Sequence, residues 1–313
     1  MRLLVTGASG FTGTALIRFL SPYEDIQITG ITRDKVTRPS GGPGGVTWVT
    51  ADLLDRDHLC RLVASLQPDA VIHLAGMNHG SPAELFMANI CGTQNLLEAV
   101  SGIKRDCRVL VTSSSAVYGY QGSSPINEEN PFQPLNEYGA AKTAQEILAV
   151  MHYRALGISV TIARPFNLAG PGQAHAFLCG KLVSQVVEFG QGKRKALDLF
   201  ETQSSRDFVD VRDAVKAYWA LVTHPRFMED CAGNAFNIGS GRSYAISEVI
   251  ATLEKITGRK YPVSLPADPQ RVALLSQQSD ISRIHRVTGW KPEISLEETL
   301  RDMLAAEQAR IAA

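Results

Sequence analysis

The sequence predicts an α/β fold, a Rossmann-type doubly wound parallel sheet with a smaller α+β substrate-binding lobe. Three observations lead to this prediction. Short apolar runs alternate with helix-like segments through the first half of the chain, and a glycine-rich turn follows the first apolar run. After Pro165, strand patterns become sparser and turns rich in Pro and Gly become more frequent. Strands that alternate with helices build βαβ units, which form a parallel sheet with helices on both faces.

The elements of the first half follow from the spacing of their apolar residues. The expected strands cover residues 3–5, 27–32, 46–49, 70–74, 109–112 and 160–163. The expected helices cover residues 11–20, 55–66, 82–100 and 138–156. Residues 38–45, Arg-Pro-Ser-Gly-Gly-Pro-Gly-Gly, are expected to form a loop because of their composition.

The second half is expected to contribute most of a separate lobe. We place the first domain at residues 1–165 and the smaller lobe at residues 166–313. The apolar runs 208–211 and 235–238 lie in a stretch, 206–240, that is expected to return to the large sheet. Helices of the second half are expected around residues 176–190, 211–222, 246–257 and 295–311.

Composition excludes several classes of protein. Lys+Arg and Asp+Glu both number 31, so the formal net charge is zero, which argues against nucleic acid or an anionic membrane as the main partner. The five cysteines are dispersed and the seven histidines show no metal-ligand spacing, so neither a disulfide framework nor a metal site is expected. Because the chain has no long apolar stretch and no secretory signal pattern, we expect a cytoplasmic protein without a membrane span.

The glycine-rich turn Gly7-Ala8-Ser9-Gly10-Phe11-Thr12-Gly13 lies between the first strand and the first helix. Glycines permit a sharp turn and let a pyrophosphate approach the backbone, while the helix N-terminus offers free N–H groups. The spacing is G-x-x-G-x-x-G and differs from the commoner G-x-G-x-x-G fingerprint. We interpret the turn as a dinucleotide-binding loop formed by Gly7, Gly10, Phe11, Thr12 and Gly13; a glycine turn without a ligand is the alternative.

The end of the second strand bears on the choice of dinucleotide. An acidic side chain there binds the ribose 2′-hydroxyl of NAD, whereas an arginine accepts the 2′-phosphate of NADP. This strand ends in Thr32-Arg33, and Asp34 comes one position late for the usual acid. Arg33 therefore favours NADP; NAD is the alternative, in which Arg33 is a solvated charge.

Three side chains form a candidate catalytic set. Tyr138 and Lys142 are spaced i and i+4, which places a phenol and an ammonium on one helix face. A nearby positive charge is expected to lower the pKa of the phenol. Ser114 follows the fifth strand, and the carboxyl ends of parallel strands line the ligand crevice. We assign catalysis to Ser114, Tyr138 and Lys142, since the Tyr–Lys spacing by itself is also common on surface helices.

These motifs, in this order, resemble the extended short-chain dehydrogenase/reductase family over nearly the whole chain. Further matching segments are Asp52-Leu53, His73-Leu74-Ala75-Gly76, Asn89 and Gly92-Thr93. The resemblance implies cofactor contacts from Asp52, Leu53, Leu74, Ala75, Gly76, Tyr138, Lys142 and Pro165. Gly76 departs from the family, which usually has Ala at this position. The resemblance also implies a homodimer formed through the helices at 82–100 and 138–156.

The second half resembles the nucleotide-sugar branch of that family. The matching runs are 164–173, 206–213, 268–271 and 288–292. They imply a nucleotide-diphosphate-sugar substrate, bound in the lobe 166–313 by Asn167, Lys181, Arg206 and Arg271 together with Ser114. Guanidinium groups suit this task because they hold phosphate oxygens bidentately. For Arg212 we expect a surface salt bridge instead.

The residues after Ser114 separate the possible reactions. Related sugar dehydratases carry acidic residues at the positions of Ser115 and Ala116, so dehydration is disfavoured unless Glu128 or Glu137 substitutes. Taken with these residues, the resemblance implies reduction of a 4-keto-6-deoxy nucleotide-sugar by NADPH, with GDP-4-keto-6-deoxymannose as the preferred substrate. The alternative enzyme is an NAD-dependent nucleotide-sugar 4-epimerase, and the alternative from a different class is a catalytically silent dinucleotide-binding regulator.

Overall fold

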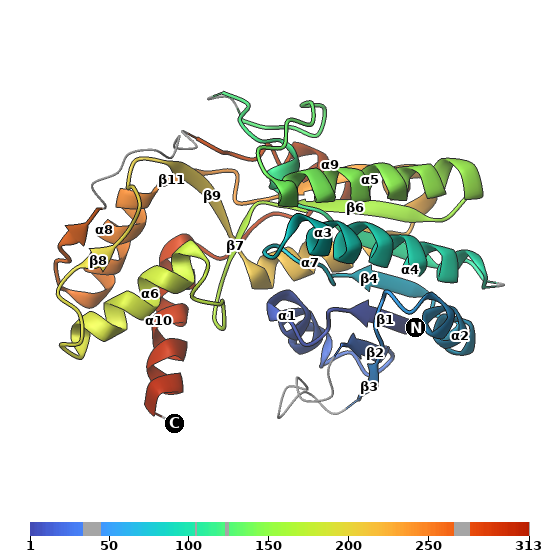
Figure 1. The fold of residues 1–313 in the computed structure, drawn as a ribbon, viewed down its shortest axis with the longest axis horizontal. Coiled ribbons are helices and arrows are strands. Elements are labelled where there is room, and N and C mark those ends of the chain that lie inside the picture. Colours follow the sequence, from blue (N-terminus) through green and yellow to red (C-terminus); the bar gives the residue numbers. More distant parts are fainter. Residues whose placement is uncertain (34–44, 104, 123–124, 266–275, 313) are drawn as a thin grey trace.

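A parallel sheet of seven strands forms the centre of the larger lobe in the computed structural model, which describes residues 1–33, 45–103, 105–122, 125–265 and 276–312 (Figure 1). The strand order is β10-β6-β5-β4-β1-β2-β3, and every pairing is parallel. The strands are β1 (Arg2–Thr6), β2 (Gln27–Thr32), β3 (Val46–Thr50), β4 (Ala70–His73), β5 (Arg108–Thr112), β6 (Val160–Pro165) and β10 (Ala235–Ile238). The predicted Rossmann-type sheet is therefore confirmed.

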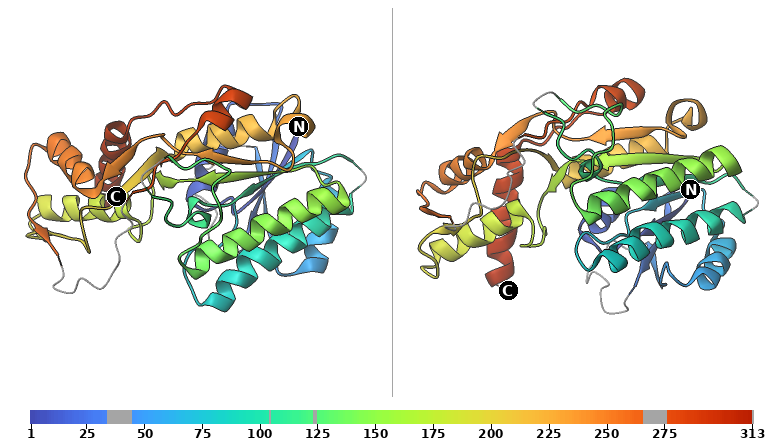
Figure 2. Two further views of the ribbon diagram at one scale, coloured as in Figure 1. Left: turned by 90° about the horizontal axis from the view of Figure 1, so that it is seen from above. Right: turned by 45° about the horizontal axis from the view of Figure 1, so that its top comes forward.

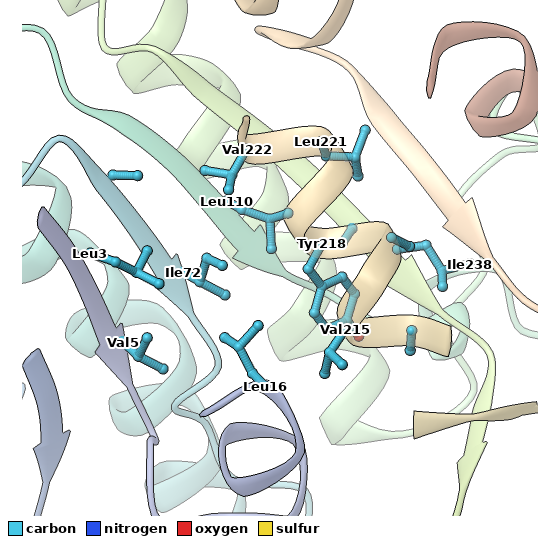
Figure 3. Close-up of a cluster of buried hydrophobic side chains, with 14 of the residues drawn as sticks. Leu3, Val5, Leu16, Ile72, Leu110, Val215, Tyr218, Leu221, Val222 and Ile238 are labelled. Carbon is cyan, nitrogen blue, oxygen red and sulfur yellow. The ribbon is translucent and has the colours of Figure 1, made fainter. Parts of the chain in front are cut away.

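One face of the sheet is covered by α1 (Phe11–Leu20) and α7 (Val211–Val222). Figure 3 shows Leu3 and Val5 of β1, Ile72 of β4 and Leu110 of β5 directed toward Leu16 and the α7 side chains. Tyr218 of α7 is fully buried in this layer. Aliphatic burial on this scale supplies most of the stabilisation of such a layer, at about 25 cal/mol for each Å² removed from water.

The opposite face is covered by α2 (Arg56–Leu66), α4 (Gly92–Ser101) and α5 (Glu137–Leu156), and the sheet lies between the two helical layers (Figure 2). The predicted helix 82–100 consists of α3 (Pro82–Phe86), a π-helical turn (Met87–Cys91) and α4. Within that turn Asn89 is buried, and its amide donates to the carbonyls of Leu85 (2.9 Å) and Met77 (2.8 Å). The wide turn thus carries a side chain that ties the helix to the strand-end loop.

In its described part, the smaller lobe contains a second layer of strands and further helices (Figure 1). Strand β9 (Ser205–Asp210) pairs with β7 (Asn167–Ala169) and with β11 (Ser243–Ala245), and β8 (Leu197–Asp198) pairs with β12 (Val263–Ser264). The lobe's helices α6 (Leu178–Gly190), α8 (Ile246–Thr257) and α10 (Leu296–Ala312) pack on one another.

The stretch 206–240 divides between the two lobes. Residues Ala235–Ile238 pair with β6 as the edge strand β10. Residues 208–210 instead belong to β9, because the chain leaves the large sheet directly after Pro165 and β7 becomes their parallel partner. α7 then packs on the large sheet, so the polypeptide crosses between the lobes more than once.

Several remaining features lie between these elements. The structure adds α9 (Ser282–Thr288), a 3₁₀ turn (Ser115–Val117) and a second π-helical turn (Phe227–Cys231), none of which the sequence patterns predicted. The predicted loop 38–45 lies outside the described residues except for Gly45. Among the helices in the described part of the chain, none is long and apolar enough to cross a membrane.

Candidate active site

The glycine-rich loop packs its backbone against the end of the neighbouring strand. Gly7 has φ +66°, and a Cβ there would lie 2.8 Å from the Ala75 nitrogen. A Cβ on Gly13 would lie 2.3 Å from the Gly7 carbonyl oxygen, which is backbone and has no room to move. α1 begins at Phe11, and the first N–H groups of a helix have no partner within it. The bare cradle and these N–H groups fit the pyrophosphate of a dinucleotide.

Three adjacent strand ends bring the other cofactor candidates to the same edge. β2 pairs with β1 and β3, so the residues that follow them leave the sheet side by side. Arg33 directly follows β2 and is exposed, whereas Asp34 lies outside the described residues. Asp52 is exposed after β3 and accepts the Leu54 N–H at 2.9 Å, while Leu53 is partly buried against α4.

The segment after β4 is fixed by the first strand. The Leu74 N–H donates to the Thr6 carbonyl at 3.2 Å, and the Ala75 N–H donates to Thr6 Oγ1 at 3.2 Å. A Cβ on Gly76 would lie 2.5 Å from Asn89 Oδ1 and 3.3 Å from Lys142 Nζ. The close approach of Asn89 therefore explains why this chain has glycine at position 76, where the family usually has alanine.

Ser114, Tyr138 and Lys142 come together at the carboxyl end of β5. Ser114 lies just past the strand and accepts the Ala116 N–H at 3.1 Å, and its hydroxyl lies near enough to the Tyr138 phenol to lower the pKa of that group. Lys142 Nζ lies 6.0 Å from the centre of the Tyr138 ring. Asn136 caps α5, its side chain accepting the Gly139 N–H at 2.8 Å, which places both residues in the first two turns of the helix. The structure thus brings together the three predicted catalytic side chains.

The protonation of this set differs in part from the expectation. Burial raises the pKa of the Tyr138 phenol, and the nearby Ser114 hydroxyl lowers it by less. The pKa of Tyr138 is therefore raised, where a lowered value was expected, because burial of the phenol outweighs the influence of Ser114. Burial also lowers the pKa of Lys142 to about 8, which the nearby Glu146 carboxylate partly opposes.

A network of buried polar side chains lies beside the carboxyl end of β5. Arg164 of β6 forms an ion pair with Glu146 of α5 (Nη2 to Oε2, 2.7 Å), and their side chains are 6% and 2% exposed. Arg164 Nη1 also donates to the Tyr118 hydroxyl at 2.7 Å. The Ser113 hydroxyl donates to Glu146, so the residue before Ser114 is held by this pair.

Two hydroxyl groups near the candidate site are buried without a hydrogen-bond partner among the described residues, Thr112 Oγ1 and Tyr218 Oη. Burial raises the pKa of Tyr218, and Tyr138 lies near enough to contribute to that shift. Buried polar groups are nearly always satisfied in native proteins. Orphaned hydroxyls beside the catalytic set are consistent with a region that receives a ligand or ordered water.

The candidate substrate residues of the small lobe gather around β9. Asn167 Nδ2 donates to the Asp207 carbonyl at 3.0 Å. Arg206 is partly buried beside α6, where it lies near Cys179 and Glu201. Lys181 of α6 has its Nζ 5.2 Å from the centre of the Phe200 ring. Among the described residues, neither Arg206 nor Lys181 forms an ion pair with an acidic side chain. Both cations are therefore available to an anionic ligand.

Two other arginines were assigned roles from the sequence, Arg271 in substrate binding and Arg212 in a salt bridge. Arg271 lies outside the described residues. Arg212 forms ion pairs with Asp210 (2.8 Å) and Asp302 (2.7 Å), as expected for a structural salt bridge.

Asp207 and Gln277 hold the site together and were missed by sequence reasoning. Asp207 is fully buried and accepts hydrogen bonds from the backbone and hydroxyl groups of Ser240 and Ser279 and from the Gly241 N–H. The side-chain oxygen of Gln277 accepts a hydrogen bond from the Ser115 hydroxyl at 3.3 Å. The backbone N–H of Gln277 donates to the Ser205 carbonyl at 3.1 Å. Gln277 therefore joins the segment after Ser114 to the strand that carries Arg206.

The positions that would carry acids in a dehydratase are occupied in a different way. Ser115 is buried and its hydroxyl is engaged by Gln277, while Ala116 has no polar side chain. Glu128 accepts the Asn237 N–H at 2.8 Å and lies 3.5 Å from Arg283, so its carboxylate is held by the protein. Glu137 is exposed at the first residue of α5.

The chain is similar to known nucleotide-sugar enzymes over its whole length. The family model described as GDP-mannose 4,6 dehydratase matches residues 4–303. GDP-6-deoxy-D-mannose reductase from Pseudomonas aeruginosa is 34% identical, covering 99% of this chain and 98% of that protein. UDP-glucose 4-epimerase from Bacillus subtilis is 28% identical, covering 96% of this chain and 95% of that protein.

A solved structure has the same fold. RMD from Pseudomonas aeruginosa, complexed with NADPH, superposes with a TM-score of 0.84 at 33% identity, covering 99% of both chains. The expected resemblance to short-chain dehydrogenases of the nucleotide-sugar type is confirmed, as is the prediction of an NAD(P)-dependent enzyme. This chain belongs to the GDP-mannose 4,6-dehydratase family.

Proposed function

We propose that the protein reduces a 4-keto-6-deoxy nucleotide-sugar with NADPH, and that GDP-4-keto-6-deoxymannose is its preferred substrate. One observation carries the proposal. Ser114, Tyr138 and Lys142 lie close together at the carboxyl end of β5, and the two positions after Ser114, Ser115 and Ala116, offer no acid for dehydration. The similarity to the Pseudomonas aeruginosa reductase supports the same reaction.

The candidate catalytic residues divide the work at the C4 oxygen. Bound NADPH supplies a hydride. Tyr138 donates a proton to the oxygen, and its raised pKa suits an acid that must hold its proton until the transfer. The Ser114 hydroxyl orients the carbonyl, and the Lys142 ammonium stabilises the phenolate that Tyr138 becomes.

The cofactor is proposed to lie along the ends of β1 to β4. Its pyrophosphate would rest on Gly7, Gly10, Phe11, Thr12 and Gly13, and Leu74, Ala75, Gly76 and Pro165 would line its path. Asp52 and Leu53 would contact the adenine. Arg33 would bind the 2′-phosphate, which makes NADP the preferred form.

The substrate diphosphate is proposed to bind in the small lobe. Arg206 and Lys181 supply positive charge there, and Asn167 supplies an amide beside them. Arg271 is retained in the proposal on the resemblance alone, since it lies outside the described residues. A guanidinium and an ammonium that form no ion pair with an acid in the described part of the chain favour an anionic ligand at this position.

Steady-state kinetics test the proposed reaction. Purified protein is mixed with NADPH and enzymatically prepared GDP-4-keto-6-deoxymannose, and the loss of reduced-nicotinamide absorbance is followed. We expect turnover by the wild type, and retained NADPH binding without turnover in Tyr138→Phe. Rapid turnover by that variant would contradict the assignment of the acid.

A nucleotide-sugar 4-epimerase with NAD is the second candidate, and the 28% identity to UDP-glucose 4-epimerase favours keeping it. Such an enzyme would use Ser114, Tyr138 and Lys142 to oxidise and then re-reduce C4. Inversion of a UDP-hexose without net consumption of NADPH would select it. A catalytically silent regulator is disfavoured because the similar proteins are nucleotide-sugar enzymes and because Ser114, Tyr138 and Lys142 lie close together.

We also propose a homodimer that works in the cytoplasm. The dimer proposal is supported by exposed apolar side chains on the helices at 82–101 and 137–156, namely Phe86, Met87, Ile147 and Met151. All five cysteines lie among the described residues as free thiols, which suits a reducing compartment. Light scattering on the purified protein measures the oligomeric state, and a monomer at micromolar concentration would contradict the dimer.

A further inference from the structure

A chain of buried hydrogen bonds runs from Lys142 into the core. Lys142 Nζ donates to the Thr112 carbonyl at 2.8 Å and to Gln145 Oε1 at 2.9 Å. Gln145 is fully buried, and its Nε2 donates to Thr93 Oγ1 at 2.7 Å. Thr93 Oγ1 lies 2.9 Å from His73 Nε2 and donates to the Asn89 carbonyl at 2.6 Å.

The direction of each hydrogen bond in this chain follows from the supply of protons. Thr93 gives its single hydroxyl proton to Asn89, so it must accept from both Gln145 and His73. His73 therefore carries its proton on Nε2, and its Nδ1 accepts from Thr6 Oγ1 at 2.6 Å. Burial and the charge of Lys142 lower the pKa of His73 to about 3, which keeps the ring neutral.

These directions leave one orientation for the Gln145 amide. Its nitrogen must face Thr93, so its oxygen must face Lys142 as a fixed acceptor. The ammonium has three protons. Two are used by Thr112 and Gln145, the third has no acceptor among the described residues, and the centre of the Tyr138 ring lies 6.0 Å from Nζ.

We infer that Gln145 is a positioning residue that holds the Lys142 ammonium and directs its remaining N–H toward the reacting groups. The inference rests on the proposed function, in which Lys142 assists Tyr138. Gln145 supplies a neutral acceptor that binds the ammonium, while the charge of Glu146 nearby is taken up by Arg164.

Other ionisable groups around Lys142 also influence the pH at which it loses its proton. Tyr138 and Glu146 come from its own helix, His73 comes from β4, and Arg164 of β6 reaches the region through Glu146. The pKa of about 8 for Lys142 places its loss of a proton within the measurable range. The alkaline limb of kcat/KM reports this ionisation in the free enzyme.

Two substitutions that keep the side chain close to the size of glutamine should move the alkaline limb of kcat/KM in opposite directions. Gln145→Glu puts a carboxylate against the ammonium, so the limb should rise by about one pH unit or more. Gln145→Met removes the acceptor, so the limb should move to lower pH and kcat should fall about 10-fold or more. Thr93→Val releases the Gln145 amide without changing Gln145, and should give a smaller shift to lower pH.

Gln185 provides a matched control, because it is another buried glutamine with two hydrogen bonds, both to the Asp198 backbone. Gln185→Glu should leave the limb unmoved. The inference is overturned if both Gln145 variants leave the limb at its wild-type position or shift it the same way. The pH dependence of NADPH binding, read by fluorescence without any sugar, gives the second measurement. The two Gln145 variants could shift the pH dependence of NADPH binding in opposite directions while the wild type reduces no ketosugar. That result would refute the proposed reaction and sustain the role of Gln145.

Discussion

Gly13 offers a quantitative test of the dinucleotide-binding loop. In Gly13→Ala the new Cβ would lie 2.3 Å from the Gly7 carbonyl oxygen and 2.6 Å from the Ala8 carbonyl oxygen. Ordinary contacts begin at 3.4 Å, so about 1 Å of backbone movement is needed. Overpacking costs typically 1–3 kcal/mol, and contacts with backbone on both sides place this variant near about 3 kcal/mol. At about 2–4 °C for each kcal/mol, the melting temperature should fall by about 6–12 °C.

The loop is also where the pyrophosphate is proposed to bind, so NADPH affinity should fall about 10-fold or more. Isothermal titration calorimetry measures the affinity, and thermal unfolding measures the stability. Gly102→Ala is the matched control, because a Cβ there meets its nearest atom at 3.5 Å and the residue has φ −80°. It should change the unfolding free energy by less than about 0.5 kcal/mol. A Gly13→Ala protein that binds NADPH and melts like the wild type would refute the close packing of the loop.

Three further predictions concern charged residues. Arg33→Ala should lower the preference for NADPH over NADH about 10-fold or more, measured as the ratio of kcat/KM values, and an unchanged ratio would remove the case for a 2′-phosphate contact. Glu146→Gln leaves the Arg164 guanidinium buried without its carboxylate, so urea unfolding should show a loss of about 3 kcal/mol or more. Because Glu146 raises the pKa of Lys142 from its buried value, the same variant should move the alkaline limb of kcat/KM to lower pH, and a limb at higher pH would contradict that coupling. Arg206→Ala should raise KM for the nucleotide-sugar about 10-fold or more with a smaller effect on NADPH binding; an unchanged KM would exclude the diphosphate contact.

Elements with a long apolar pattern were predicted well from the sequence. The strand 27–32 and the helix 211–222 have the bounds found in the structure. The helix Ser282–Thr288 was missed because seven residues are too few to establish a helical period. The π-helical turn at 87–91 was missed because it follows from the buried contacts of Asn89, which the helical pattern does not contain.

The residues of the candidate site likewise fall into those that the sequence predicted and those that it did not. Gly7, Gly13 and the Tyr138–Lys142 pair are visible as motifs because their residues lie close together in the sequence. Gln277 was not predictable, since the residue it contacts, Ser115, lies 162 positions away. Gln145 was passed over for a different reason: it adjoins the motif, but its importance depends on Thr93 of another helix.

Transfer of deuterium from labelled NADPH tests the central claim most directly. The wild-type enzyme is incubated with reduced cofactor deuterated on its transferring position and with GDP-4-keto-6-deoxymannose, and the product is analysed by mass spectrometry and NMR. A 4-keto reductase places one deuterium at C4 for each NADPH consumed, and Tyr138→Phe should form no labelled product above background. Product without deuterium at C4, or interconversion of C4 epimers without consumption of NADPH, would contradict the reductase assignment.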